Sequence, residues 1–351
     1  MQQLDRVLYT AEATWHILCE SVESARQDSA LIIYLVFASN TLLFCKQPKM
    51  TALSMNFKNR SFRQYIPLLF LASTYICWLF MQGINSALAN FMSQISIAIT
   101  MIFGSFVAGG TALGGGAVAF PVMTKVLAIE PATAKVFSLA IQSFGMTAAS
   151  LTIIFSGIKY YRSVVLFALF GALPGVAISL LFITDLLPRL VTKSLFSIFL
   201  LVFAITLLRA HWKGKQQLDI DLSCKKKNAL VVFVALLGGI VSGLIGSGAD
   251  IAIFALLMLH FKADLKVATA TSVIVMAVTS VFASGINLLY LNAITAPLSQ
   301  YVLAAIPVVV IGAPLGAYCC AKVPKSVLLS FLLMLIGLEI AFTLYEIIGN
   351  L

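Results

Sequence analysis

This chain is organised around the stretch Gly104-Ser-Phe-Val-Ala-Gly-Gly-Thr-Ala-Leu-Gly-Gly-Gly-Ala-Val-Ala-Phe-Pro121. The consecutive glycines Gly114, Gly115 and Gly116 interrupt a long apolar run, and a short apolar segment follows from Ala117 to Ile129. Consecutive glycines strongly disfavour a helix. We therefore expect a helix that breaks inside its apolar run and then starts again.

The same pattern returns 134 residues later, in Gly238-Gly-Ile-Val-Ser-Gly-Leu-Ile-Gly-Ser-Gly-Ala-Asp-Ile-Ala-Ile-Phe254. The offset of 134 aligns Gly114 with Gly248 and Ser138 with Ser272, and it holds without a gap from Gly104 to Ser150. Matched glycines and serines are harder to explain by chance than matched apolar residues. The sequence therefore contains a duplicated unit.

Composition places the chain in a membrane. Of its 351 residues 61% are hydrophobic and 10% are charged, whereas soluble domains carry about 25% charged residues. In lipid, backbone groups must be satisfied within helices or closed barrels, and these apolar runs are too long and uniform for barrel strands. We therefore predict an all-α polytopic membrane protein, with the lipid bilayer as a partner.

The net charge of +10 does not point to nucleic acid, because the basic residues lie in short loops, where they orient membrane proteins. The six cysteines show neither metal-ligand nor disulfide spacing. The sequence therefore predicts no metal site, no cofactor and no nucleic-acid partner.

The order of the apolar segments divides the chain into five parts. Residues 1–30 carry several charges and are expected to form a surface segment, and residues 31–83 two extra transmembrane helices joined by a basic loop. A first repeat then spans residues 84–210, a polar linker residues 211–228, and a second repeat residues 229–351.

Each repeat is expected to hold about five helical segments, of which the second is short. These short pieces, Ala117–Ile129 and Ile251–His260, are shorter than the roughly 20 residues that span a bilayer. Such lengths are typical of the half-helices and re-entrant helices of transporters. Whether the short piece turns back or completes a crossing decides between parallel and inverted repeats.

Charge favours inverted repeats. In that arrangement the linker and the basic loops Lys159–Arg162, Phe261–Lys266 and Lys322–Lys325 all lie on the cytoplasmic side, as basic loops generally do. A parallel arrangement would put Lys159–Arg162 and the linker outside. We therefore favour two inverted repeats with short broken helices behind the two extra N-terminal helices.

The two breaks are candidate anion sites. A helix that restarts inside the membrane presents free N–H groups and a positive dipole end, and inversion would bring the two breaks together. Glycines in membrane helices also serve close packing alone, and serine often bonds its own helix. The candidate substrate-binding residues are Gly114, Gly115, Gly116, Ser138, Gln142, Gly248 and Ser272.

Asp250 stands at the second break, where the offset aligns it with Gly116. A charge in the membrane costs about 2.5–3.5 kcal/mol on the insertion scale. Asp250 is either the N-cap of the short helix Ile251–His260 or a proton carrier, because burial and a neighbouring anion both favour a neutral carboxyl group. Glu339, in the last apolar segment, is the alternative proton carrier.

Several motifs resemble the sulfite exporter TauE/SafE family of membrane transporters over roughly residues 95–348. They are Ala117-Val-Ala-Phe-Pro121 with Ala134-Lys-Val-Phe-Ser138, and in the second copy Gly243-Leu-Ile-Gly-Ser-Gly with Lys266-Val-Ala-Thr-Ala-Thr-Ser272. The resemblance implies a multi-pass permease of the cytoplasmic membrane for sulfite, sulfonates or related anions, and it implies no catalytic residue. Asp250 departs from the family, which usually has glycine there.

The expected function is therefore secondary transport of a small anion, namely sulfite, a sulfonate or another sulfur-containing anion, with proton coupling as a further hypothesis. The alternatives are an intramembrane enzyme and a membrane scaffold or regulatory protein. The sequence contains no His-Glu-x-x-His and no Gly-x-Ser-x-Gly motif, so we expect no enzyme. A homo-oligomer is compatible with the sequence.

Overall fold

A computed structural model of the chain describes residues 65–112, 114, 119–120, 122–127, 129–184 and 225–324, with isolated positions between 198 and 208 and between 326 and 337. The regular elements in this part are all helices. The predicted surface segment, the first extra N-terminal helix and most of the linker lie outside the described residues. So do Gly115, Gly116 and Glu339.

The first repeat does not begin with one long helix. The sequence predicts a continuous piece from Ser86 to Leu113, but the structure has α5 (Ile84–Ser93) and then α6 (Ile95–Gly110). They separate at a polar step where Ser93 donates its hydroxyl to the carbonyl oxygen of Asn90 at 2.9 Å. Such side-chain bonds compete with helical backbone bonds. Before them, α4 (Ile66–Gln82) meets α5 at an angle of 96°.

The duplicated unit is visible in the helix bounds. The remaining helices are α8 (Pro131–Phe155), α9 (Arg162–Ile178), the π-helix η4 (Ser179–Ile183), α11 (Lys225–Ile245), α12 (Ala249–Leu259), α13 (Leu265–Leu289) and α14 (Leu298–Lys322). Adding 134 to both bounds of α8 gives both bounds of α13. Each begins with a helix-start signal: Pro131 at the first position of α8, and Asp264 as the N-cap of α13.

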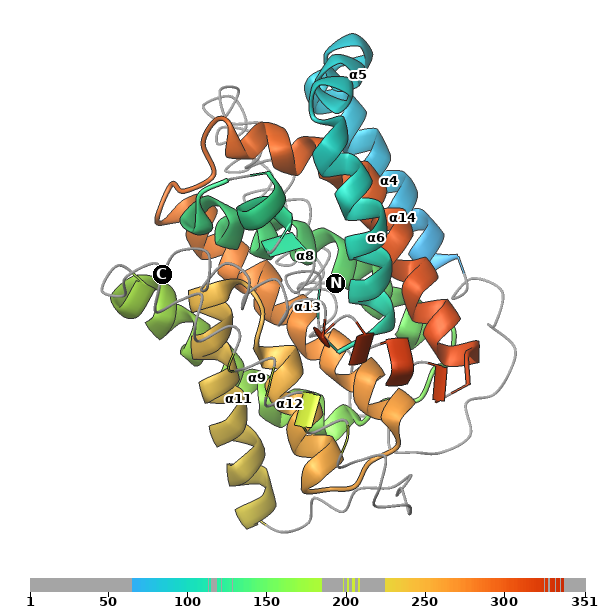
Figure 1. Ribbon diagram of the computed structural model, residues 1–351, viewed down its shortest axis with the longest axis vertical. Coiled ribbons are helices and arrows are strands. Elements are labelled where there is room, and N and C mark those ends of the chain that lie inside the picture. Colours follow the sequence, from blue (N-terminus) through green and yellow to red (C-terminus); the bar gives the residue numbers. More distant parts are fainter. Residues whose placement is uncertain are drawn as a thin grey trace, which may run out of the picture.

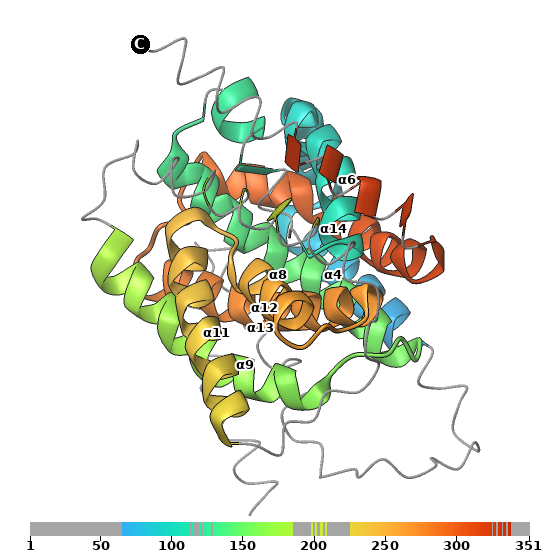
Figure 2. The same cartoon turned by 60° about the horizontal axis from the view of Figure 1, so that its bottom comes forward.

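Helices of one copy of the unit pack against helices of the other copy. Helix α6 packs along α14 and α11 along α9, with α8 and α13 between the two pairs (Figures 1 and 2). The offset of 134 relates α6 to α11 and α9 to α14. The first helix of each copy therefore lies against the fourth segment of the other.

Glycines allow the two helices of each pair to pack at short distance. A Cβ atom added to Gly109 would lie 2.6 Å from the carbonyl carbon of Ala313, and one added to Gly243 would lie 2.6 Å from the hydroxyl oxygen of Ser179. The offset relates these two contacts to each other. Small residues let membrane helices approach in this way, so packing accounts for Gly109 and Gly243.

Within the described residues, five helices are long and apolar enough to cross a membrane: α8, α9 with η4, α11, α13 and α14. There are up to six if the bent pair α4 and α5 counts as one span. Large apolar side chains are exposed on the outside, such as Phe80, Phe103 and Phe170. Helix α8 is the most enclosed, because 89% of its most apolar window is buried within the protein. Polar side chains on α8 therefore face other helices and not lipid.

Candidate functional site

The second break lies between α11 and α12. Gly246 has φ +84°, a conformation that glycine adopts at little cost, and it ends α11. Helix α12 restarts at Ala249, two residues earlier than the predicted Ile251. Asp250 therefore lies inside the first turn, and not directly before the helix as the N-cap alternative would have it.

The first break differs from the second. Helix α6 ends at Gly110, and Gly114 has φ +66°. Of the predicted short helix Ala117–Ile129, the structure describes Ala119 and Phe120, which are helical, and then a π-helical turn, η3 (Val122–Val126). Pro121 has no N–H to donate, and Thr124 donates its hydroxyl to the carbonyl oxygen of Phe120 at 2.8 Å. Both features disfavour a regular α-helix here.

The two breaks meet. A Cβ atom added to Gly114 would lie 2.8 Å from the hydroxyl oxygen of Ser247 and 3.1 Å from Oε1 of Gln142, and it would overlap Oδ2 of Asp250. Only glycine fits at position 114, because three side-chain oxygens face its α-carbon. We call the following group the junction: Gly114, Ser138, Gln142, Gly246, Ser247 and Asp250.

Helix α8 binds the second break through Ser138 and Gln142, which lie one turn apart. Nε2 of Gln142 donates to the carbonyl oxygen of Gly246 at 2.7 Å, and the Ser138 hydroxyl donates to the same oxygen at 3.3 Å. Both side chains are buried. The carbonyl oxygen of Gly246, at the end of α11, therefore accepts its hydrogen bonds from side chains of the first copy of the unit.

Asp250 is fully buried and holds the start of its own helix. Its Oδ1 accepts from the backbone N–H of Gly248 at 3.1 Å and of Ile251 at 2.9 Å. The Ser247 hydroxyl lies 3.3 Å from Oδ1 and 3.4 Å from Oδ2. The N–H of Ala249 donates to the Ser242 hydroxyl at 2.8 Å. The N–H groups that the sequence predicts to be free for an anion are therefore occupied, two of them by the Asp250 carboxylate.

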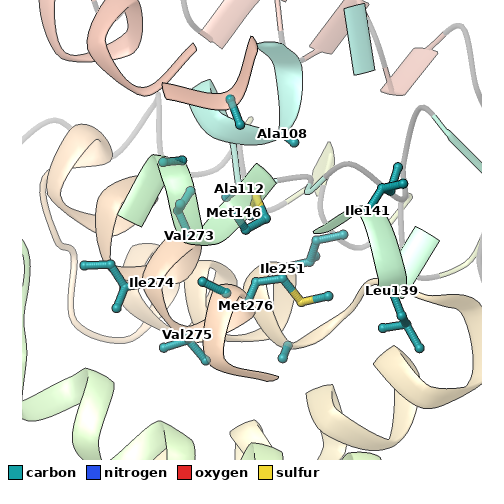
Figure 3. Close-up of a cluster of buried hydrophobic side chains, with 14 of the residues drawn as sticks. Ala108, Ala112, Leu139, Ile141, Met146, Ile251, Val273, Ile274, Val275 and Met276 are labelled. Atoms are coloured by element: carbon teal, nitrogen blue, oxygen red, sulfur yellow. The ribbon is translucent and has the colours of Figure 1, made fainter. Parts of the chain in front are cut away.

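The two copies are not equivalent at this point. The hydroxyl of Ser272, aligned with Ser138, donates to the carbonyl oxygen of Thr269 in its own helix at 2.9 Å. The position aligned with Gln142 is Met276. Met276 belongs, with Ala112, Met146 and Ile251, to the apolar cluster around the breaks (Figure 3). The structure thus brings Gly114, Ser138, Gln142, Gly248 and Asp250 together, but gives Ser272 a bond within α13.

Sequence reasoning missed Ser242, Ser247 and Lys135. Ser242 and Ser247 lie within the repeated glycine motif, so their position could have indicated them. Lys135 is buried, and its carbonyl oxygen lies 3.0 Å from a Cβ atom added to Gly246. It stands three residues before Ser138 in an apolar helix, and an ionisable residue in such a segment is a functional candidate.

A cavity of about 360 Å³ lies among α6, α8, α13 and α14. Lys159, Asp264 and Lys266 line it, and so does Gly109, near the end of α6. Nζ of Lys266 donates to the carbonyl oxygen of Ala321 at 2.7 Å. The loops before α9, before α13 and after α14 therefore lie at one end of the molecule. The distribution of basic residues in the sequence predicts that these loops lie on the same side.

Together these features define a multi-pass α-helical membrane protein with a duplicated unit whose two broken segments meet in the core, an arrangement found in secondary transporters. The chain belongs to the sulfite exporter TauE/SafE family, whose model matches residues 97–342. The match covers α6 to α14, including the junction, and confirms the predicted resemblance. Searches of curated proteins and of solved structures found no match.

Proposed function

We propose that this protein is a secondary transporter that moves a small sulfur-containing anion, such as sulfite or a sulfonate, across the cytoplasmic membrane. The observation that carries the proposal is the meeting of two broken segments in the buried core of a member of a sulfite exporter family. The anion binds at the start of α12, where backbone N–H groups converge on a negative charge.

Asp250 couples the anion to a proton in this proposal. When the site is empty, the ionised carboxylate accepts from the N–H groups of Gly248 and Ile251. Hydrogen bonds to a charged group are roughly twice as strong as neutral ones, so a neutral carboxyl group releases these donors more easily. The anion then takes the place of the carboxylate, and anion and proton move together.

We further propose that the repeats are inverted, behind two extra N-terminal transmembrane helices. The reciprocal pairing of α6 with α14 and α11 with α9 supports two related halves. The basic loops that line one cavity support a common cytoplasmic end.

Cysteine labelling tests this topology. If the linker is cytoplasmic, a membrane-impermeant thiol reagent applied to intact cells should leave Cys224 unlabelled and should label it after the cells are opened. The Cys224→Ser variant identifies the signal from this residue among the six cysteines. Labelling of Cys224 in intact cells would show that the inverted arrangement is wrong.

Flux into proteoliposomes tests the transport function. Vesicles with the purified protein should take up at least one of sulfite, thiosulfate, sulfate or a short sulfonate, and should take up acetate more slowly. Mass spectrometry should recover the anion unchanged, whereas an intramembrane enzyme would release a different compound. The proposal fails if none of these sulfur anions enters faster than into protein-free vesicles.

A further inference from the structure

One acceptor in the junction has no donor among the residues that the structure describes. Within that part of the chain, Oε1 of Gln142 is buried without a hydrogen-bond partner, and the whole side chain is only 1% exposed. Leaving a buried polar atom unpaired costs about 1–3 kcal/mol, so such an atom in the core calls for an explanation. This oxygen faces Gly114, on the same side as Oδ2 of Asp250.

The amide cannot turn around to relieve this oxygen. Nε2 of Gln142 donates to the carbonyl oxygens of Gly246 at 2.7 Å and Ser138 at 3.1 Å, and it lies 2.8 Å from the Ser138 hydroxyl oxygen. Carbonyl oxygens only accept hydrogen bonds. A flipped amide would place Oε1 against both of them, so the bond network determines the orientation of Gln142.

The two oxygens of Asp250 differ in the same way. Oδ1 accepts two backbone N–H groups, whereas the partner of Oδ2 is the Ser247 hydroxyl at 3.4 Å, which Oδ1 shares. Oδ2 is therefore the oxygen that is better placed to carry a proton. An ionised Oδ2 and the Gln142 amide oxygen are both acceptors, so they repel each other. A proton on Oδ2 could be donated to Oε1 of Gln142 and would satisfy both oxygens.

We propose that Gln142 is the proton partner of Asp250: the neutral carboxyl group donates from Oδ2 to Oε1 of Gln142, and this bond holds the two breaks together at Gly114. The inference rests on the proposed function for its role in transport. On release of the proton, Oδ1 keeps the N–H groups of Gly248 and Ile251, and the contact of the ionised Oδ2 with Gln142 becomes repulsive. Gln142 is thus a positioning residue that selects the protonated state.

The elements packed around the junction also carry charged groups. Helix α11 carries Lys225–Lys227 at its far end, α13 begins with Asp264 and Lys266, and α8 carries Lys135. The Asp250 carboxyl group contacts the Ser247 hydroxyl and the backbone N–H groups of Gly248 and Ile251. The amide of Gln142 is thus the acceptor that decides where the proton is held.

Infrared titration of the protein in lipid vesicles, without any transported anion, tests the pair. We expect a carboxylic C=O band that fades as the pH rises and is missing in Asp250→Asn. In Gln142→Met, which copies the residue at the aligned position 276, the band should change frequency and fade about one pH unit lower, because the neutral form loses a hydrogen bond. Ser138→Ala, which keeps Oε1, is the matched control and should shift far less.

Thermal unfolding gives a second measurement that does not depend on Gln142→Met folding. If the native state holds a proton that the unfolded chain releases, stability falls as the pH rises. The melting temperature of the wild-type protein should therefore fall over the range in which the band fades. Asp250→Asn, whose side-chain NH₂ can donate to Gln142 permanently, should show no such fall.

Two results would overturn the pairing: an Asp250 band unaffected by Gln142→Met, or the same pH dependence of melting in wild type and Asp250→Asn. Neither measurement involves transport. Vesicles that show the pairing but no flux would therefore contradict the proposed function alone, and flux without the pairing would contradict this inference alone.

Discussion

Gly114→Ala should abolish anion flux. The residue has φ +66°, where a side chain costs about 1–2 kcal/mol. Its new Cβ atom would overlap Oδ2 of Asp250 and press on Ser247 and Gln142. Because Oδ1 of Asp250 and Nε2 of Gln142 are both bonded to backbone groups, these side chains cannot move aside without breaking the junction. Since about 1.4 kcal/mol is a factor of ten, initial flux should fall at least about tenfold.

Gly157→Ala is the matched control for this substitution. Gly157 has a similar backbone conformation, with φ +74°, but a Cβ atom added there would meet nothing within 4 Å. It should lose a comparable amount of stability and keep its flux. Gly285→Ala, in open space on α13, should change neither quantity. If Gly114→Ala transports as well as Gly157→Ala, the junction is not part of the anion path.

The sequence predicted the duplicated unit, because glycines and serines recur at a fixed offset, and α8 and α13 keep that offset in both bounds. It also predicted both breaks and placed Asp250 beside one of them. Local propensity suffices for these features, because consecutive glycines and a proline disfavour a helix in any surroundings.

Other features depend on packing and could not be predicted in this way. Ser138 and Ser272 are equivalent in the alignment of the two copies. Yet the Ser138 hydroxyl donates to Gly246 at the second break, and the Ser272 hydroxyl donates to Thr269 in its own helix. The start of α12 at Ala249 depends on Ser242 in the preceding helix. Asp250 accepts from N–H groups that were expected to be free. This depends on the direction of its side chain, which the spacing of residues in the sequence does not determine.

Asp250→Asn should abolish accumulation driven by a pH gradient. Asparagine keeps a side-chain oxygen that can accept from the N–H groups of Gly248 and Ile251. The start of α12 should therefore stay in place. The variant cannot release a proton, so it loses the coupling while the local structure remains.

The measurement is anion uptake into proteoliposomes with an imposed pH difference and the membrane potential clamped. With one proton per anion, a difference of one pH unit can sustain about tenfold accumulation. We expect wild-type protein to approach that ratio and Asp250→Asn to stop at equal concentrations, with exchange of anion across the membrane reduced far less. Asp264→Asn is the matched control, because Asp264 is also a buried aspartate that accepts from backbone N–H groups at a helix start, those of Lys266 and Val267. Asp264→Asn should accumulate anion as wild type does. If Asp250→Asn does so too, Asp250 serves only to hold the start of α12, and the proton must be carried elsewhere, with Glu339 as the next residue to replace.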